Sequence, residues 1–147
     1  MIKTKVKDAV LVELKVISSR GDFLYIFEEV DKFFKIKRIF TISGQDIKDA
    51  DRGHHAHRRD QQIVTCPSGA ISLTLKDGTS KRVFEIDSPE KAVYVPTYIW
   101  GETTYLEEGT VVSVYSSEYY DESSYIRDYD LFLKIRNHPK GEDLWRY

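Results

Sequence analysis

The stretch "AISLTLKDGTSKRVFEIDSPEKAVYVP", from Ala70 to Pro96, decides the fold class. It holds three short runs rich in apolar, β-branched and aromatic residues, and the turn sequences "KDGT" and "DSPE" separate them. Asp77 and Gly78 stand at the tip of the first turn, and an Asp-Gly pair between two such runs is typical of a β-hairpin. Short strands at this spacing predict a sandwich or a barrel rather than a βαβ fold.

The same pattern continues on both sides, until the C-terminal part changes its period. Further runs of strand character are "DAVLVELKVI", "FLYIF", "FKIKRIFTI", "QIVTC" and "TVVSVYS". Helical spacing instead relates Tyr125, Ile126, Tyr129, Phe132 and Leu133, which we expect to pack a helix onto the barrel. The prediction is one all-β domain over residues 1–147, with a helix at about 121–136 that Asp121 or Ser123 caps, and a polar tail over 137–147.

The composition of the 147 residues limits the classes of function. A net charge of −2 excludes a global positive field that would attract nucleic acid, although local basic clusters can still bind a small anion. Cys66 is the single cysteine, so we expect no intrachain disulfide, no cysteine-based zinc site and a cytoplasmic location. The N-terminal residues alternate charged and apolar side chains, which is unlike a signal peptide, and we expect no membrane partner.

The stretch "DRGHHAHRRDQQ", residues 51–62, places three of the four histidines of the chain among arginines. On a strand, His55 and His57 would point to one face and His54 to the other. Three interpretations are open for this cluster. It is a metal site, a pair of acid/base imidazoles above one substrate, or a basic surface loop.

The neighbouring residues favour acid/base chemistry over a metal site. Metal-binding cupins place a glutamate shortly after an H-x-H pair and a third histidine in a later strand. Gln61 and Gln62 stand near the first of these places, and "VPTYIWGE" (95–102), where the second would fall, has no histidine. Two imidazoles and neutral amides make a poor divalent site. Arginines, by contrast, suit phosphate and help to keep a nearby imidazole neutral.

Four segments carry a resemblance to a known family: "KRIFTI", "RGHHAHRRDQQIVTCPSG", "LKDGTSKRVFEIDSPEKAVYVPTYIWGE" and "SSEYYDESSYIRDYD". Together they resemble the sugar-nucleotide 3,4-ketoisomerases, small metal-free cupins related to the deoxysugar 3,5-epimerases, over roughly Ser18 to Leu133. The resemblance implies a cupin jelly-roll barrel with a C-terminal helix, a homodimer, and an isomerase without a cofactor. It also implies dTDP-4-keto-6-deoxyglucose as the substrate, bound inside the barrel.

The resemblance assigns roles to single residues. The family motif R-G-x-H-x-H maps the catalytic histidines onto His55 and His57, and we expect His57 to be the main base. Substrate-binding residues are expected at Arg20, Arg38, Arg52, Gln62, Trp100, Glu102 and Tyr119. The alternative for the arginines is a solvated surface charge, and for the aromatic residues it is packing in the core or at a dimer contact. Gly101 stands where the family usually has His or Arg, which leaves open the product configuration at C4.

The implied reaction moves a ketone from C4 to C3 of the sugar. The C4 ketone acidifies the proton on C3, a base removes this proton to give an enediolate, and a proton returns at C4. Two alternatives remain. A related epimerase would return the proton to the carbon that lost it, and a non-catalytic cupin would only bind a sugar nucleotide.

Overall fold

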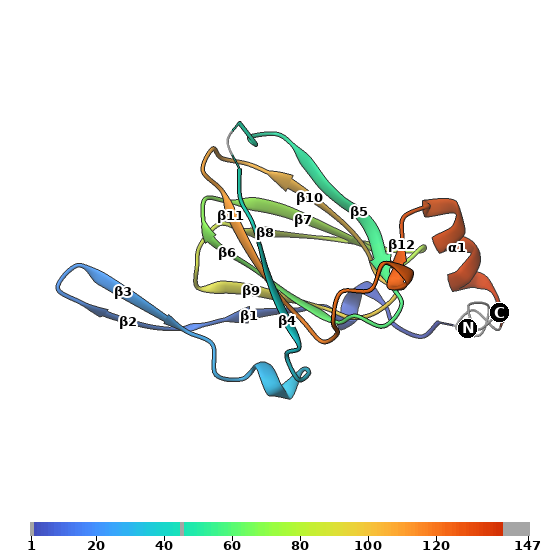
Figure 1. Cartoon of the computed structure of the whole chain (residues 1–147), viewed down its shortest axis with the longest axis horizontal. Helices are drawn as coiled ribbons and strands as arrows, with labels where there is room; N and C mark the ends of the chain where they lie inside the picture. The colour runs from blue at the N-terminus through green and yellow to red at the C-terminus, as the bar shows by residue number, and fades with distance from the viewer. Residues whose placement is uncertain (1, 45, 140–147) are drawn as a thin grey trace.

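The computed structural model describes residues 2–44 and 46–139 of the chain. Two five-stranded antiparallel sheets enclose a barrel (Figure 1). The first sheet has the order β1 (Val10–Glu13), β9 (Lys91–Val95), β6 (Gln62–Ser68), β11 (Val111–Ser116) and β4 (Arg38–Ile42). The second has the order β12 (Tyr125–Ile126), β5 (Asp51–His57), β10 (Trp100–Tyr105), β7 (Ile71–Lys76) and β8 (Lys81–Ile86). Short 3-10 helices lie at η1 (Val6–Asp8) and η2 (Val30–Lys32). The predicted all-β fold is confirmed.

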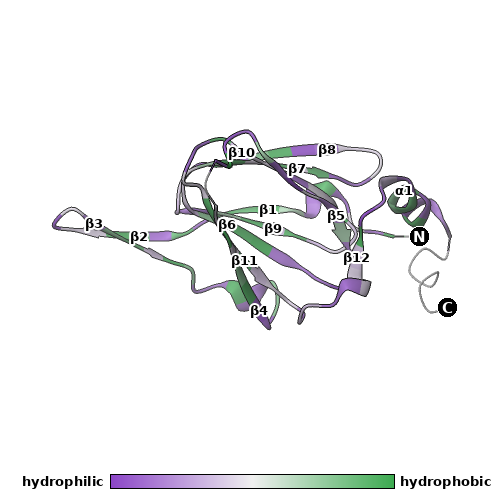
Figure 2. Cartoon of the chain, turned by 45° about the horizontal axis from the view of Figure 1, so that its top comes forward, coloured by the Kyte–Doolittle hydropathy of each residue, from purple (hydrophilic) through white to green (hydrophobic). Residues whose placement is uncertain are grey.

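Alternating apolar side chains fill the space between the two sheets. Ile71, Leu73 and Leu75 of β7 are buried, and the residues between them are only partly buried. Val93 and Val114 of the first sheet belong to the same cluster. Hydrophobic colour accordingly covers much of β9 and β11 in Figure 2. The predicted hairpin between β7 and β8 is present.

The strands β2 (Lys15–Ser19) and β3 (Asp22–Ile26) form a separate hairpin that extends away from the barrel (Figure 1). Within the described residues these two strands pair only with each other. Arg20 lies in the turn of the hairpin with a φ of +55°. Four large hydrophobic side chains of the hairpin are exposed to solvent: Ile17, Phe23, Leu24 and Tyr25.

The C-terminal helix begins later than predicted. A 3-10 helix, η3 (Glu122–Ser124), comes first, and Asp121 caps it by accepting a hydrogen bond from the backbone N–H of Ser123 at 3.0 Å. Strand β12 follows, and the α-helix α1 covers only Tyr129–Asn137, capped by Asp128. The prediction of a helix at about 121–136 is therefore wrong for its first half. Residues 140–147 of the predicted polar tail lie outside the described residues.

Pairing with β5 explains why the segment before α1 is a strand. Tyr125 pairs with His57, and Ile126 pairs with Ala56. The guanidinium of Arg58 donates to two backbone oxygens of this segment, at 2.6 and 2.8 Å. Neighbouring residues of a strand point to opposite faces, so Tyr125 turns into the barrel and Ile126 packs outside it.

The helix α1 covers the outer face of the second sheet. Phe132 and Ile135 are fully buried in a cluster with Ala56 of β5 and Trp100 of β10. The ring centroids of Trp100 and Tyr129 lie 5.0 Å apart. The predicted packing of Tyr129 and Phe132 against the barrel is confirmed. No helix in the described part of the chain is long and apolar enough to cross a membrane.

Candidate active site

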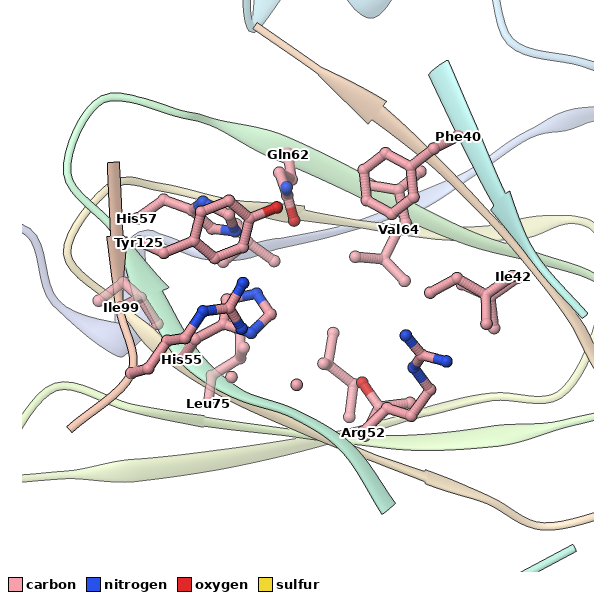
Figure 3. A pocket seen from close by; sticks show the side chains of 18 of the residues that line it. Phe40, Ile42, Arg52, His55, His57, Gln62, Val64, Leu75, Ile99 and Tyr125 are labelled. Carbon is pink, nitrogen blue, oxygen red and sulfur yellow. The ribbon is translucent and has the colours of Figure 1, made fainter. Parts of the chain in front are cut away.

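A cavity of about 240 Å³ lies inside the barrel, between the two sheets. Its walls are largely apolar, with Phe40 and Val64 from the first sheet and Leu75 from the second. The side chains in it that can bind a ligand or transfer a proton include Arg52, His55, His57, Gln62, Tyr125 and Arg127. Figure 3 shows the histidines, Gln62 and Tyr125 together and Arg52 farther along the cavity.

A β-bulge in β5 lets Arg52 and His55 share this cavity. Along a regular strand, residues three apart point to opposite faces. Gly53 and His54, however, have φ angles of +88° and +55°, and the register against β10 shifts at this point. His54 is turned to the outer face, where its Nδ1 lies 3.8 Å from Oε1 of Glu102. The predicted separation of His54 from the other two histidines is confirmed.

The two cavity histidines form a compact cluster with Tyr125. The ring centroids of His55 and His57 are 4.8 Å apart, and the rings are nearly perpendicular. The Tyr125 ring lies 5.0 Å from that of His55 and 4.4 Å from that of His57. Because β5 carries both imidazoles and β12 pairs with it, the backbone fixes this arrangement. Two imidazoles at this separation can act on one bound sugar.

Burial keeps both imidazoles neutral at pH 7. Burial lowers the pKa of His55, and a hydrogen bond with the Gly53 backbone opposes only part of this effect. Burial lowers the pKa of His57 to about 3, with help from His55, Arg38 and Arg127. A neutral imidazole has a lone pair that can accept a proton. Among the described residues, no group of three or more His, Cys, Asp or Glu is placed to hold a metal ion.

Two guanidinium groups lie in the same cavity as the histidines. Arg127 binds Glu122 through hydrogen bonds of 2.8 and 3.1 Å, and its Cζ lies 4.3 Å from the centroid of the Tyr125 ring. The hydrogen bonds that Arg127 and Tyr120 donate lower the pKa of Glu122 to about 2, so the Arg127 pair is ionic. Arg52 makes no hydrogen bond and no ion pair within residues 2–44 and 46–139. Its donors are therefore available to a ligand.

A second, polar cavity adjoins the first at His57. Arg38, Asp60 and Tyr119 line it. Arg38 and Gln62 each donate a hydrogen bond of 3.0 Å to the same oxygen of Asp60. Two predicted substrate-binding residues, Arg38 and Tyr119, thus lie beside the second cavity, and Gln62 connects the two cavities through Asp60.

Comparisons with known proteins agree with this geometry. The family described as FdtA, WxcM-like, C-terminal, matches residues 7–137. A TDP-4-oxo-6-deoxy-alpha-D-glucose-3,4-oxoisomerase from Aneurinibacillus thermoaerophilus is 38% identical over 121 residues, which cover 82% of this chain and 86% of that protein. The chain belongs to the FdtA family.

Solved structures of 3,4-ketoisomerases share the fold of this FdtA-family chain. QdtA from Thermoanaerobacterium thermosaccharolyticum, in complex with TDP, has a TM-score of 0.81 and 33% identity, covering 88% of this chain and 94% of that one. The TDP-fucose-3,4-ketoisomerase WlaRA from Campylobacter jejuni has a TM-score of 0.79 and 27% identity, covering 88% and 96%. These comparisons confirm the resemblance to 3,4-ketoisomerases, the cupin-like fold and the assignment to the isomerases.

Three predicted substrate-binding residues of this FdtA-family chain lie away from its own cavities. Trp100 and Glu102 are on the outer face of β10, where the indole N–H donates to the carboxylate at 3.1 Å and the ring packs against Phe132. Arg20 lies in the hairpin turn, away from the barrel (Figure 1). Side chains two residues apart on a strand point to the same face, which explains why Trp100 and Glu102 are both on the outer face. Gly101, between them, faces the cavity, so a larger side chain at this position would enter it.

Three residues beside the histidines escape prediction from the sequence. Tyr125 and Arg127 both line the cavity, Tyr125 from strand β12 and Arg127 from the residue directly after that strand, whereas the spacing of the apolar residues in this segment predicts a helix. Their separation by one residue is the available signal, since it places both on one face of a strand. Asp60 sits at the end of a basic run, and nothing in its sequence surroundings marks it as a neighbour of His57.

Proposed function

We propose that this chain converts dTDP-4-keto-6-deoxyglucose to a dTDP-3-keto-6-deoxyhexose by proton transfer through His55 and His57. The observation that carries the proposal is a pair of neutral imidazoles buried in one cavity of the barrel. A relative at 38% identity is named as a TDP-4-oxo-6-deoxyglucose 3,4-oxoisomerase. A histidine-to-asparagine variant of QdtA has been solved in complex with TDP-4-keto-6-deoxyglucose. Both support a TDP-linked 4-keto sugar as the substrate.

The reaction starts with a neutral imidazole, for which we favour His57. The imidazole takes the proton from C3, and the electron pair of that bond forms the double bond of an enediolate. A proton moves from the oxygen on C3 to the oxygen on C4, and an imidazolium returns a proton to C4, which leaves the ketone at C3. Every atom and electron of the substrate is retained, so the reaction consumes no redox equivalent. His55, 4.8 Å away between ring centroids, is the second proton carrier.

The arginines of the cavity divide into two roles in this proposal. The guanidinium of Arg52 can donate two parallel hydrogen bonds to a ligand, which suits the diphosphate of the nucleotide. Arg127 is fixed by Glu122 and lies beside Tyr125, next to the imidazoles. Donors placed there stabilise the negative charge that develops on the enediolate oxygen.

NMR of the sugar during incubation with dTDP-4-keto-6-deoxyglucose in D₂O tests the proposed function. We expect the ketone carbon signal to move from C4 to C3. Deuterium at C3 or C5 while the ketone stays at C4 would identify the chain as an epimerase. Binding of the nucleotide sugar without any chemical change would identify it as a non-catalytic cupin.

We also propose that the protein is a homodimer and that the β2–β3 hairpin packs on the second copy. An isolated two-stranded hairpin is marginally stable in water, and this one exposes Phe23 and Leu24. Arg20, at the tip of the hairpin, then binds substrate in the cavity of the partner. A cytoplasmic location belongs to the same proposal, because the buried free thiol of Cys66 suits a reducing compartment.

A further inference from the structure

Asp60 is a buried carboxylate directly behind His57. It lies in the connection between β5 and β6, and only 3% of its side chain is exposed. Its Oδ2 is 3.9 Å from Nδ1 of His57. Because burial of a carboxylate is costly, such a group needs donors or a cation around it.

Five donors hold this carboxylate in place. Arg38, Gln62 and Ser116 donate to Oδ2 at 3.0, 3.0 and 3.1 Å. The hydroxyl of Ser117 and the backbone N–H of Glu118 donate to Oδ1 at 3.4 and 3.2 Å. These donors come from β4, β6, β11 and the loop after β11, so the barrel itself fixes the carboxylate.

The imidazole of His57 lacks hydrogen-bond partners among the residues that the structure describes, whereas the nearby carboxylate can accept a hydrogen bond. Both ring nitrogens are buried, and neither makes a hydrogen bond within the described part of the chain. A neutral imidazole has one N–H to donate and one lone pair, and an ionised carboxylate can only accept. Asp60 therefore favours the tautomer with its proton on Nδ1, the nitrogen that faces it. The other groups around the ring are His55, Arg38, Arg127 and Tyr125.

We infer that Asp60 is a positioning residue for His57: its carboxylate accepts the Nδ1–H, fixes this tautomer and leaves Nε2 to exchange protons with the substrate. The part at the substrate rests on the proposed function. The 3.9 Å between Nδ1 and Oδ2 exceeds a hydrogen bond, so the inference requires the imidazole to turn toward Asp60, as catalytic contacts tighten when substrate binds. Once Nε2 takes the C3 proton, Asp60 stabilises the imidazolium beside the guanidinium groups of Arg38 and Arg127.

Nitrogen-15 NMR of the histidine rings in the unliganded full-length protein tests the tautomer. His57→Asn identifies the signals of His57 by their loss. Near neutral pH we expect the proton on Nδ1 and the lone pair on Nε2 in the wild type. In Asp60→Asn this fixed form is lost, and Nε2–H is populated. A wild-type His57 protonated at Nε2, or an unchanged tautomer in Asp60→Asn, overturns the inference.

Kinetics separate positioning from a purely structural role. Asp60→Asn is expected to lower kcat by roughly tenfold to a hundredfold with KM changed less than about threefold. Asp87→Asn is the matched control, because it removes an exposed carboxylate that pairs with Lys91 at 2.8 Å and lines neither cavity. Equal kcat values for the two variants overturn the inference.

The two measurements also separate this inference from the proposed function. If the wild type does not isomerise the dTDP-4-keto sugar, the proposed function fails, and the NMR result still decides the role of Asp60. If Asp60→Asn does not fold, the wild-type tautomer alone supports or overturns the inference.

Discussion

Three histidines of one short stretch occupy two different chemical environments because of the strand that carries them. The side chain of His54 is 51% exposed on the outer face, whereas that of His57 is 9% exposed inside the barrel. Removal from water penalises the charged form of an imidazole, so the inner pair stays neutral at pH 7. The same type of side chain can thus accept a proton at the inner positions and is a solvated surface group at the outer one.

This difference yields a prediction for three matched variants. His55→Asn and His57→Asn should each lower turnover of the dTDP-4-keto sugar by about a hundredfold or more, because each removes a proton carrier. His54→Asn should keep wild-type turnover, because its side chain lies outside the cavity. Initial rates measured by NMR, with circular dichroism as the control for folding, check this. Full turnover in both inner variants would show that the imidazoles are not the catalysts.

The buried imidazole also makes stability depend on pH. His57 has a pKa of about 3 in the folded protein and 6.5 in the unfolded chain. Between these values the unfolded state binds more protons, so the free energy of unfolding falls as the solution is acidified from pH 6.5 toward 3. The limiting slope is about 1.4 kcal/mol per pH unit for one histidine. Urea unfolding at several pH values gives the free energy of unfolding as a function of pH, and this dependence should be weaker for His57→Asn than for the wild type. An equal pH dependence would contradict the low pKa of His57.

At the scale of the element, the bulge in β5 decides what enters the cavity, and Gly53 makes it possible. Its φ is +88°, and a Cβ at this position would lie 2.8 Å from the backbone oxygen of Gly101. Gly53→Ala should therefore lower the free energy of unfolding by about 1–3 kcal/mol and raise KM, because Arg52 loses its inward position. Gly109→Ala is the control, since it also has a positive φ, +73°, but nothing lies within 4 Å of its Cβ. Equal losses in the free energy of unfolding for the two variants, measured by urea unfolding, would show that the contact with Gly101 does not destabilise Gly53→Ala.

The bulge also shows where prediction from sequence stops. Turn sequences between alternating runs are enough to predict the strands, and strand parity is enough to pair His55 with His57. The inward position of Arg52 was not predictable by parity, because it depends on a positive φ at His54, which is unusual for a residue other than glycine. The sequence assigns Tyr125 to the helix, because its spacing to Tyr129 and Phe132 is helical. Only its pairing with β5, distant in the sequence, selects the strand.

At the scale of the whole molecule, the β2–β3 hairpin is the element that exposes the most apolar surface. Phe23 and Leu24 are 62% and 57% exposed, and no other strand of the described chain covers the hairpin. Exposed apolar side chains gathered on a projecting element are typical of an interface. A symmetric dimer buries the same patch on both copies, so one hairpin sequence serves two contacts.

The exposed hairpin therefore predicts a dimer, and it predicts that polar substitutions in the hairpin separate the two chains. At micromolar concentration, sedimentation velocity should give twice the mass of one chain for the wild type. The double variant Phe23→Ser, Leu24→Ser should sediment as one chain, because it removes the exposed apolar surface. Val83→Ser is the control, since Val83 is also exposed but lies on β8 of the barrel. A monomeric wild type would contradict the dimer.

The position of Arg20 allows a last test, of whether the two chains share their active sites. Arg20→Ala should raise KM if its guanidinium binds the nucleotide sugar of the partner, because a bidentate donor is lost. A chain with Arg20→Ala keeps its histidines, and a chain with His57→Asn keeps Arg20. Mixed dimers of these two variants should then contain one complete cavity and recover part of the wild-type rate. Rates that merely add up those of the separate variants would show that Arg20 does not act in the cavity of the partner.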